Sequence, residues 1–261
     1  MEREKWMKLL PWISTPILLA LVIGGWDLAI TAFGVSPYVL PRPGTVAETL
    51  SEMVVEADTW EHIQATVVET VVGFVIALVL GIAMGVTLGK IRWLEVAVRP
   101  LIVASQVIPK VALIPLFVIW FGFGITSKVI MALLLAFFPI MLNVLLGVRS
   151  VDPGHQDVMR SLDAGRWQTL RHLELKSTLP YVFAGMEVGI VFALIGAIVG
   201  EYLGGSQGLG FLVVETLNAL DGPRLFGVII LLAFLGSLMF FAINGLKRIF
   251  IPWHESVISA Q

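Results

Sequence analysis

The chain has 261 residues, of which 57% are hydrophobic and 14% are charged, and its mean hydropathy is +0.92. Soluble domains carry about 25% charged residues, so this composition excludes an ordinary water-soluble globule, and the net charge of −2 lacks the basic excess of a nucleic-acid-binding protein. The absence of cysteine excludes disulfides, zinc–thiolate sites and cysteine nucleophiles.

Six segments are apolar enough to cross a bilayer, which takes about 20 mostly apolar residues. We predict spans at about 11–33, 64–89, 100–121, 126–147, 180–203 and 224–246. The first is too long in its apolar part, and too acidic in its leader, for a cleavable signal peptide. The pattern predicts an all-α polytopic membrane protein whose single transmembrane domain covers residues 1–261.

The basic residues predict an orientation with both termini in the cytoplasm, because Lys and Arg concentrate in cytoplasmic loops. In that orientation the inner segments hold thirteen of the 17 Lys and Arg residues. The outer segments hold only Arg42, Lys128 and Arg224, and Lys110 lies within a span.

Two connecting segments are too long to be simple linkers. On the outer side, residues 34–63 open with prolines, and Thr45 and Glu48 then have the spacing of a capping box. Apolar residues follow at helical intervals, at Val46, Leu50, Met53 and Val54. We therefore predict an amphipathic outer helix that turns Glu48, Glu52 and Glu56 toward water. The inner connection, residues 148–179, is polar, charged and compatible with helix.

Small residues recur on two of the predicted spans. Glycine or alanine falls at every fourth position from Gly73 to Gly89, and glycines line a face of the fifth span from Gly185 to Gly204. Such spacing lets helix backbones approach closely in lipid. We interpret it as packing within the chain, with a subunit interface as the alternative. The glycine-rich segment 204–221 is read either as re-entrant or as a turn on the outer surface.

Two motifs suggest enzymatic chemistry, and neither is complete. Gly204–Gly208 matches the G-x-S-x-G nucleophile pattern around Ser206, but only His62 is expected on the same side of the membrane as a base. Gly85–Ile91 approaches a phosphate-binding loop, yet it is one residue short and lacks the Ser or Thr that binds magnesium. We expect a flexible loop and no nucleotide hydrolysis by this chain.

Ionisable residues inside the spans are candidates for function, since a charge at mid-bilayer costs about 2.5–3.5 kcal/mol even on insertion scales. Lys110 follows Pro109 near the middle of its span, and Glu187 and Glu201 lie toward opposite ends of the fifth span. We take Gln106, Lys110, Glu187 and Glu201 as candidate pathway residues, with structural ion pairs as the alternative.

The inner connection carries a recognisable pattern. Asp157–Trp167 and Leu173–Pro180 resemble the EAA loop of binding-protein-dependent ABC importer permeases, with Asp157 at the acidic position and Leu173 and Leu175 at apolar ones. The chain departs from that loop at Val158, Met159, Asp163 and Lys176, where two alanines, a glycine and a proline are usual.

Other stretches are similar to the nitrate, sulfonate, taurine and bicarbonate branch of the same permeases. They follow in order as Leu40–Pro43, Gln106–Leu116, Trp120–Gly124, Ala197–Tyr202 and Gly208–Gly210. The resemblance implies the type I ABC importer permease fold, with six transmembrane helices, a coupling helix around Ser161–Trp167 and an outer helix. It also implies a bacterial inner membrane location and inward transport of a small, anionic solute: a sulfonate, nitrate, bicarbonate, an aromatic acid or a pyrimidine-like precursor.

The resemblance further implies a division of labour among several chains. Two cytoplasmic ATPase subunits would bind ATP and magnesium and dock on the coupling loop, an extracytoplasmic binding protein would deliver the solute, and a second permease copy would complete a homodimer. This chain would bind no cofactor and no nucleic acid. The residues expected to meet the ATPase are Asp157, Arg160, Ser161, Leu162, Asp163, Ala164, Gly165, Arg166 and Trp167. The main alternative is a self-contained secondary transporter or channel, which often shows an inverted repeat that we do not find; a membrane enzyme is a more distant one.

Overall fold

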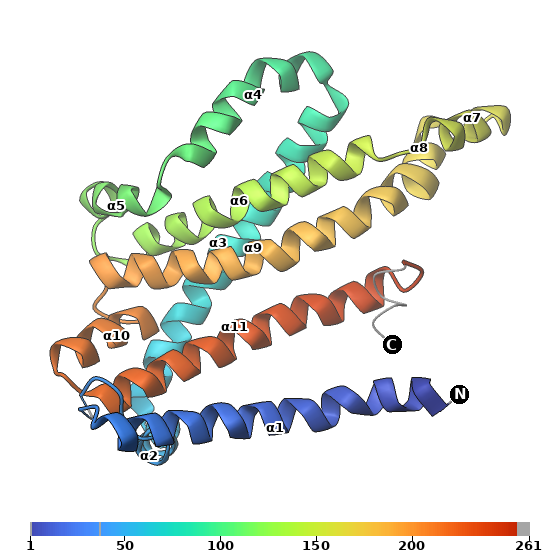
Figure 1. Cartoon of the computed structure of the whole chain (residues 1–261). Coiled ribbons are helices and arrows are strands. Elements are labelled where there is room, and N and C mark those ends of the chain that lie inside the picture. Colours follow the sequence, from blue (N-terminus) through green and yellow to red (C-terminus); the bar gives the residue numbers. More distant parts are fainter. Residues whose placement is uncertain (1, 37, 255–261) are drawn as a thin grey trace. The chain divides into compact units, whose positions relative to one another are not determined.

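The computed structural model describes residues 2–36 and 38–254, with side chains from Ser14 onward. Every regular element in these ranges is a helix, and five of them have 25 residues or more (Figure 1). The elements are α1 (Glu2–Phe33), α2 (Pro43–Val55), α3 (Ala57–Lys90), α4 (Arg92–Val107), η1 (Lys110–Leu113), α5 (Ile114–Phe121), α6 (Ile125–Arg149), α7 (Pro153–Ser161), α8 (Arg166–Thr169), η2 (Leu170–Glu174), α9 (Leu175–Gly204), α10 (Leu209–Asn218) and α11 (Gly222–Phe250).

Five of the six predicted spans correspond to single helices, namely α1, α3, α6, α9 and α11, each long and apolar enough to cross a membrane. The prediction of one straight helix over 100–121 is wrong. The segment begins earlier, at Arg92, and bends by 84° between α4 and the pair η1–α5. Pro109 stands at this break, where it has no amide hydrogen to continue the helix. Counted with this bent pair, the described chain has six spans.

The chain divides into two compact units. Unit 1 comprises residues 1–60 and 212–231, and unit 2 comprises residues 61–211 and 232–261. Within unit 1, the Arg224 guanidinium meets the Glu56 carboxylate at 2.6 Å, and the Trp60 indole donates to the Val54 carbonyl at 2.8 Å. The ion pair joins the end of α2 to the first turn of α11, and the indole bond joins α2 to the first turn of α3.

The outer helix α2 is present, with two corrections to its predicted details. It begins at Pro43 after Arg42, without a side-chain cap, so the capping box at Thr45 is wrong; proline fits a first helical turn because its missing amide needs no partner there. Glu48 and Glu52 are exposed as predicted. Glu56 instead pairs with Arg224.

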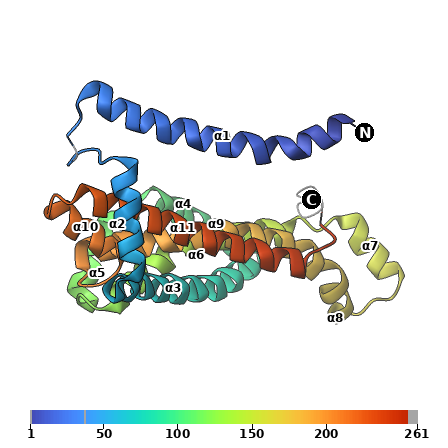
Figure 2. The same cartoon turned by 90° about the horizontal axis from the view of Figure 1, so that it is seen from below.

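In unit 2, α6 lies between α3 and α9, and both contacts depend on glycine. A Cβ at Gly85 of α3 would lie 2.7 Å from the Val144 Cβ, and one at Gly196 of α9 would lie 2.7 Å from the Ala132 Cα. Figures 1 and 2 show α6 and α9 running side by side. The interpretation of the glycine spacing as packing within the chain is therefore confirmed for both helices.

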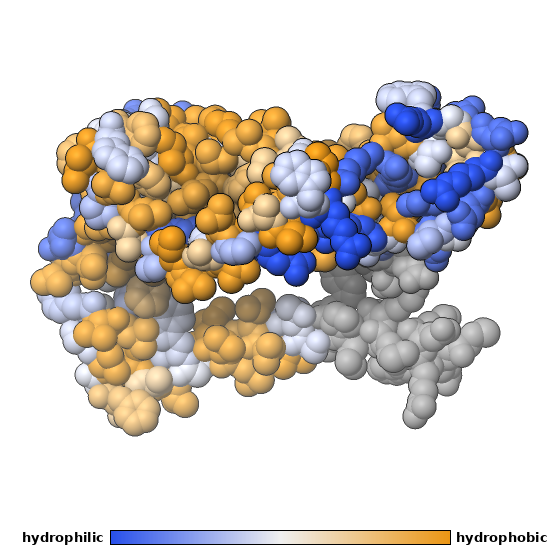
Figure 3. All heavy atoms as spheres, turned by 90° about the horizontal axis from the view of Figure 1, so that it is seen from above, coloured by the Kyte–Doolittle hydropathy of each residue, from blue (hydrophilic) through white to orange (hydrophobic). Residues whose placement is uncertain are grey.

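The surface of unit 2 changes character along the helices. Figure 3 shows apolar residues over the face that carries α4 and α5, and hydrophilic residues gathered at the end that carries α7 and α8. Exposed apolar side chains such as Leu101, Val107 and Ile119 suit contact with lipid, in which apolar exposure has no hydrophobic cost. The polar end is the part of unit 2 built for water.

Candidate functional site

The inner segment, residues 153–174, is a folded helix–turn–helix. Asp152 caps α7, since its carboxylate accepts the Gly154 amide at 2.6 Å. The other end of α7 closes with two backbone bonds, from the Asp163 amide to the Arg160 carbonyl and from the Ala164 amide to the Met159 carbonyl, each 3.0 Å. This pair of bonds is the Schellman motif, which satisfies the last carbonyls of a helix.

The prediction of a helix around Ser161–Trp167 is wrong in its boundaries. Ser161 ends α7 and Arg166 begins α8, so the middle of that range is the turn between the two helices. Asp163 stands at the left-handed position of the turn, with φ of +50°. Aspartate tolerates this conformation better than most residues, but glycine adopts it without steric cost. The glycine that is usual at this position of the EAA loop thus has a conformational reason.

Asp163→Gly is expected to stabilise the inner segment by about 0.5–1 kcal/mol, because it removes the strain of a side chain at positive φ. Asp163→Val, which places a β-branched residue there, is expected to destabilise the segment by more than that. Protease susceptibility between residues 158 and 170 of the purified protein measures both. Equal susceptibility of the two variants would contradict the role of this turn.

Ion pairs attach the inner segment and its surroundings to the transmembrane helices. Glu174, in the π-helical turn η2, pairs with Lys90 at the end of α3 at 2.7 Å. Glu95 at the start of α4 is almost fully buried and receives Arg99 at 2.7 Å and Arg149 of α6 at 3.3 Å. The inner segment is therefore joined to α3 by an ion pair and to α9 by the helix that continues from η2.

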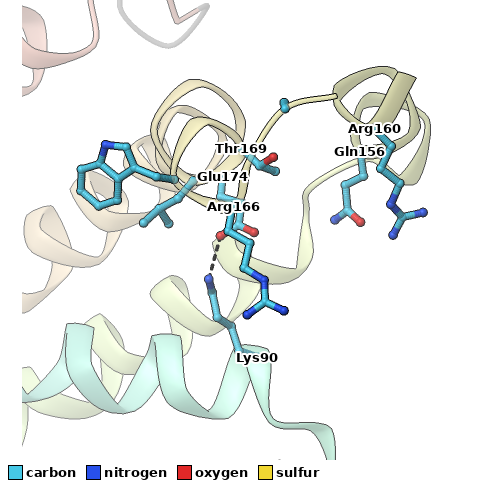
Figure 4. A pocket seen from close by; sticks show the side chains of 9 residues that line it. Lys90, Gln156, Arg160, Arg166, Thr169 and Glu174 are labelled. Atoms are coloured by element: carbon cyan, nitrogen blue, oxygen red, sulfur yellow. Dashed lines mark hydrogen bonds and ion pairs between the residues drawn. The ribbon is translucent and has the colours of Figure 1, made fainter. Parts of the chain in front are cut away.

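A cavity of about 850 Å³ opens between the inner segment and the end of α3. Figure 4 shows Lys90 and Glu174 joined at its wall, with Arg166 beside them and Gln156 and Arg160 on α7. Leu162 and Trp167 are each 71% exposed, although both are large and apolar. Exposed apolar anchors beside basic side chains, on a polar protein end, are typical of a protein interface.

The four candidate pathway residues do not form one group. Gln106 is exposed near the end of α4, and the Lys110 ammonium lies 5.1 Å from the centre of the Phe138 ring, a cation–π contact. Glu187 pairs with Lys247 at 3.0 Å. Glu201 is buried near the other end of α9. Gln106 and Lys110 thus flank the α4 break, whereas the two glutamates join helices.

Glu201 organises the outer turn, residues 205–210. Its carboxylate accepts the Thr66 hydroxyl and the Gly210 amide, both at 2.6 Å. The Thr66 oxygen in turn accepts the Leu209 amide at 2.8 Å, and His62 Nδ1 accepts the Gly208 amide at 3.0 Å. Side chains of α3 and α9 therefore hold three successive backbone amides. The segment 204–221 is largely the helix α10 rather than a long turn.

Lys128 is the residue that sequence reasoning placed incorrectly. The sequence places it among the basic residues of the outer segments, but it lies in the first turn of α6, where it is 4% exposed. Its ammonium pairs with Glu69 of α3 at 3.1 Å and donates to the Gln207 carbonyl at 3.4 Å. The sequence does hold a signal for this ion pair. Glu69 and Lys128 both lie near the outer ends of their predicted spans, and neither has an oppositely charged residue close to it in the chain.

Ser206 and His62, the two residues of the nucleophile pattern, both lie near the outer turn. Ser206 is exposed on the outer turn, and His62 uses Nδ1 to accept the Gly208 amide. A serine nucleophile needs a base oriented toward its hydroxyl, and the Nδ1 atom of His62 is engaged by the Gly208 amide instead.

Comparison with known proteins adds a consistent set of similarities. Residues 77–255 match the family described as binding-protein-dependent transport system inner membrane component. The chain is 37% identical to the riboflavin transport system permease protein of Chloroflexus aurantiacus, over 98% of this chain and 94% of that protein. It is 37% identical to the formylaminopyrimidine transport permease protein of Halalkalibacterium halodurans, over 91% and 94%. It is also 29% identical to a putative aliphatic sulfonates transport permease protein of Bacillus subtilis, over 94% and 89%.

Proposed function

Since the chain belongs to the family of binding-protein-dependent transport system inner membrane components, a family of ABC transporter permeases, we propose that it forms the solute path of an ATP-driven importer. Its place is the inner membrane, which it crosses several times. In this proposal both termini are cytoplasmic, as the distribution of Lys and Arg indicates. Two separate ATPase subunits bind ATP and magnesium, and a second copy of this chain completes the path.

The inner segment carries this proposal. Its exposed Leu162 and Trp167 offer apolar anchors for a cytoplasmic partner, and Arg160, Arg166 and Trp167 line the cavity beside the end of α3. The Lys90–Glu174 pair and the start of α9 connect the anchors to the membrane helices. An ATPase bound here would move α3 and α9 together when it closes on ATP.

The solute is proposed to be a small organic molecule delivered from the outside by a binding protein. The sequence alone favoured an anion. The two relatives at 37% identity are named for riboflavin and formylaminopyrimidine, whereas the sulfonate relative is at 29%. We therefore favour the pyrimidine-like class among the expected solutes. Gln106 and Lys110, at the break after α4, are proposed to face the path.

Affinity purification of the tagged full chain from its native membrane tests the proposal. An ATPase subunit is expected to co-purify, and uptake is expected to require ATP hydrolysis. Uptake that persists in vesicles without ATP and without an ATPase subunit would instead support the self-contained secondary transporter or channel, and it would overturn the proposal.

A further inference from the structure

Three charged side chains are buried together beside the outer turn, and the proposed function gives them no role. Glu69 of α3, Lys128 of α6 and Glu201 of α9 are 2%, 4% and 1% exposed, and all three belong to unit 2. We call them the outer charge cluster. If both carboxyl groups were ionised, the cluster would hold two negative charges and one positive charge. Such an excess is costly in a buried site, because no water solvates it.

The two carboxyl groups of the cluster share a hydrogen bond. An ionised carboxylate only accepts hydrogen bonds, so this bond requires a proton on one of the two groups. Glu201 is the better acceptor, because each of its oxygens already receives a donor. Its Oε1 accepts the Thr66 hydroxyl and its Oε2 accepts the Gly210 amide, both at 2.6 Å. Short bonds from two donors suit an ionised carboxylate.

Glu69 is therefore the group that is placed to carry the proton. Its Oε1 lies 3.1 Å from the Lys128 ammonium, whereas its Oε2 is buried and receives no hydrogen from the described residues. An ionised Oε2 would be a buried acceptor without a donor, which is unfavourable. A proton on Oε2 turns that atom into the donor of the bond to Glu201. It also makes the cluster neutral, with Lys128 and Glu201 as its two charges.

We propose that the outer charge cluster is a proton-binding site, which takes one proton from solvent and holds it on Glu69 Oε2 against the Glu201 carboxylate. The bound proton keeps Glu201 in position for the Thr66 hydroxyl and the Gly210 amide, and it thereby attaches the outer turn. Loss of the proton to solvent would leave two carboxylates in contact, which repel each other strongly at reduced dielectric. This inference goes beyond the proposed transport function and does not depend on an ATPase.

Three other titratable groups lie near the cluster. His62, 6% exposed, accepts the Gly208 amide with Nδ1, so it also holds the outer turn. Tyr202 follows Glu201 in the chain and is 41% exposed. Glu61 is exposed and lines an outer cavity together with Glu69 and Lys128. A test of the proton site must therefore separate Glu69 from His62 and Tyr202.

Infrared spectroscopy of the purified full-length protein tests the proton directly, because the C=O stretch of a protonated carboxyl is separate from the bands of a carboxylate. At about pH 7, where exposed Asp and Glu residues are ionised, the original chain is expected to show a protonated-carboxyl band. Glu69→Gln is expected to remove this band. Glu201→Gln should remove it as well, because Glu69 is then the single carboxyl beside Lys128 and ionises.

Glu187→Gln is the matched control for these variants. Glu187 also lies on α9, but it pairs with Lys247 at 3.0 Å, and no described carboxyl shares a hydrogen bond with it. The protonated-carboxyl band should be unchanged in this variant. A band that is absent from the original chain, or that survives in Glu69→Gln, would overturn the proton site.

Hydrogen exchange at residues 208–210 tests the attachment of the outer turn. Each exchange rate is divided by the rate of an unprotected amide at the same pH, and residues 185–196 of α9 serve as the internal reference. Between about pH 7 and pH 10, a range that exceeds the usual pKa of a glutamate, the original chain is expected to lose the infrared band. Protection at 208–210 is expected to fall severalfold with it, while the reference stays protected.

The variants assign this response to one group. Glu69→Gln should keep the turn protected throughout, because its side-chain N–H takes the place of the proton and cannot be lost. His62→Gln, whose amide oxygen can accept the Gly208 amide, and Tyr202→Phe should respond like the original chain. Loss of the response in either of these two variants would assign it to that residue and overturn the proposal. A band and a protection that change separately, or that both persist to about pH 10, would overturn the release of the turn by proton loss.

Discussion

Trp167→Ala is expected to abolish solute uptake while leaving a folded membrane protein. Trp167 makes few contacts inside the chain, as its 71% exposure shows, so truncation costs the fold little. As a buried anchor in an ATPase interface, a tryptophan of this kind contributes about 2–4 kcal/mol, which corresponds to a loss of affinity on the order of 30-fold or more. Uptake, ATP hydrolysis stimulated by the binding protein, and co-purification of the ATPase measure the effect together.

Trp93→Ala provides the matched control for Trp167. Trp93 is 73% exposed on α4, outside the inner segment, so its truncation removes a similar area without touching the proposed interface. Leu162→Ala, at the turn of the inner segment, is expected to act like Trp167→Ala but more weakly. If uptake falls equally in the Trp93 and Trp167 variants, or in neither, the inner segment is not the site that receives the ATPase.

Gly196→Leu is expected to prevent stable folding. A Cβ at this position would lie 2.7 Å from the Ala132 Cα and 2.7 Å from the Met131 carbonyl oxygen, and these are backbone atoms that cannot rotate away. Separating α9 from α6 would lose most of the contact between the two helices, at a cost of about 3 kcal/mol or more. Size-exclusion profiles and thermal unfolding of the detergent-solubilised protein report the loss.

Gly245→Leu on α11 serves as the control for Gly196→Leu. Nothing lies within 4 Å of a Cβ built at Gly245, and leucine has a higher helix propensity than glycine. This variant should fold at least as well as the original chain. Gly196→Ala is expected to show an intermediate loss, because its Cβ alone meets the Ala132 backbone. A stable Gly196→Leu protein would show that α6 and α9 are separable.

The spans were predictable from sequence because each requires only a long apolar run, which is a local property. The break after α4 was not, although Pro109 was visible, because proline inside an apolar run signals either a kinked helix or its end. Beyond the 84° bend, α5 contacts α6 and α9. No short stretch of the amino-acid sequence specifies those contacts.

The same difference between local signals and long-range contacts explains which functional residues could be predicted. The inner segment was located through its resemblance to a known loop, but its helix boundaries were misplaced, because Asp163 in a left-handed conformation ends α7 where a continuous helix was expected. The Glu69–Lys128 pair was missed because its members are far apart in the chain, and a lysine next to a predicted outer loop is ordinarily solvated. Glu201 was recognised as unusual by its burial in an apolar run, yet its partners, Thr66 and the Gly210 amide, required the folded chain.

The position of α6 between two glycine faces has a consequence for the synthesis of the protein. A chain made from its N-terminus delivers Glu69 to the membrane before Lys128, so when α6 is inserted its lysine finds a counter-ion already present on α3 and avoids the cost of an unpaired charge in lipid. The other face of α6 has no partner until α9 has been translated, after the whole inner segment. During that interval the α9-facing side of α6 would lie against lipid or the insertion machinery, so the packing of unit 2 around α6 would be completed only when α9 arrives.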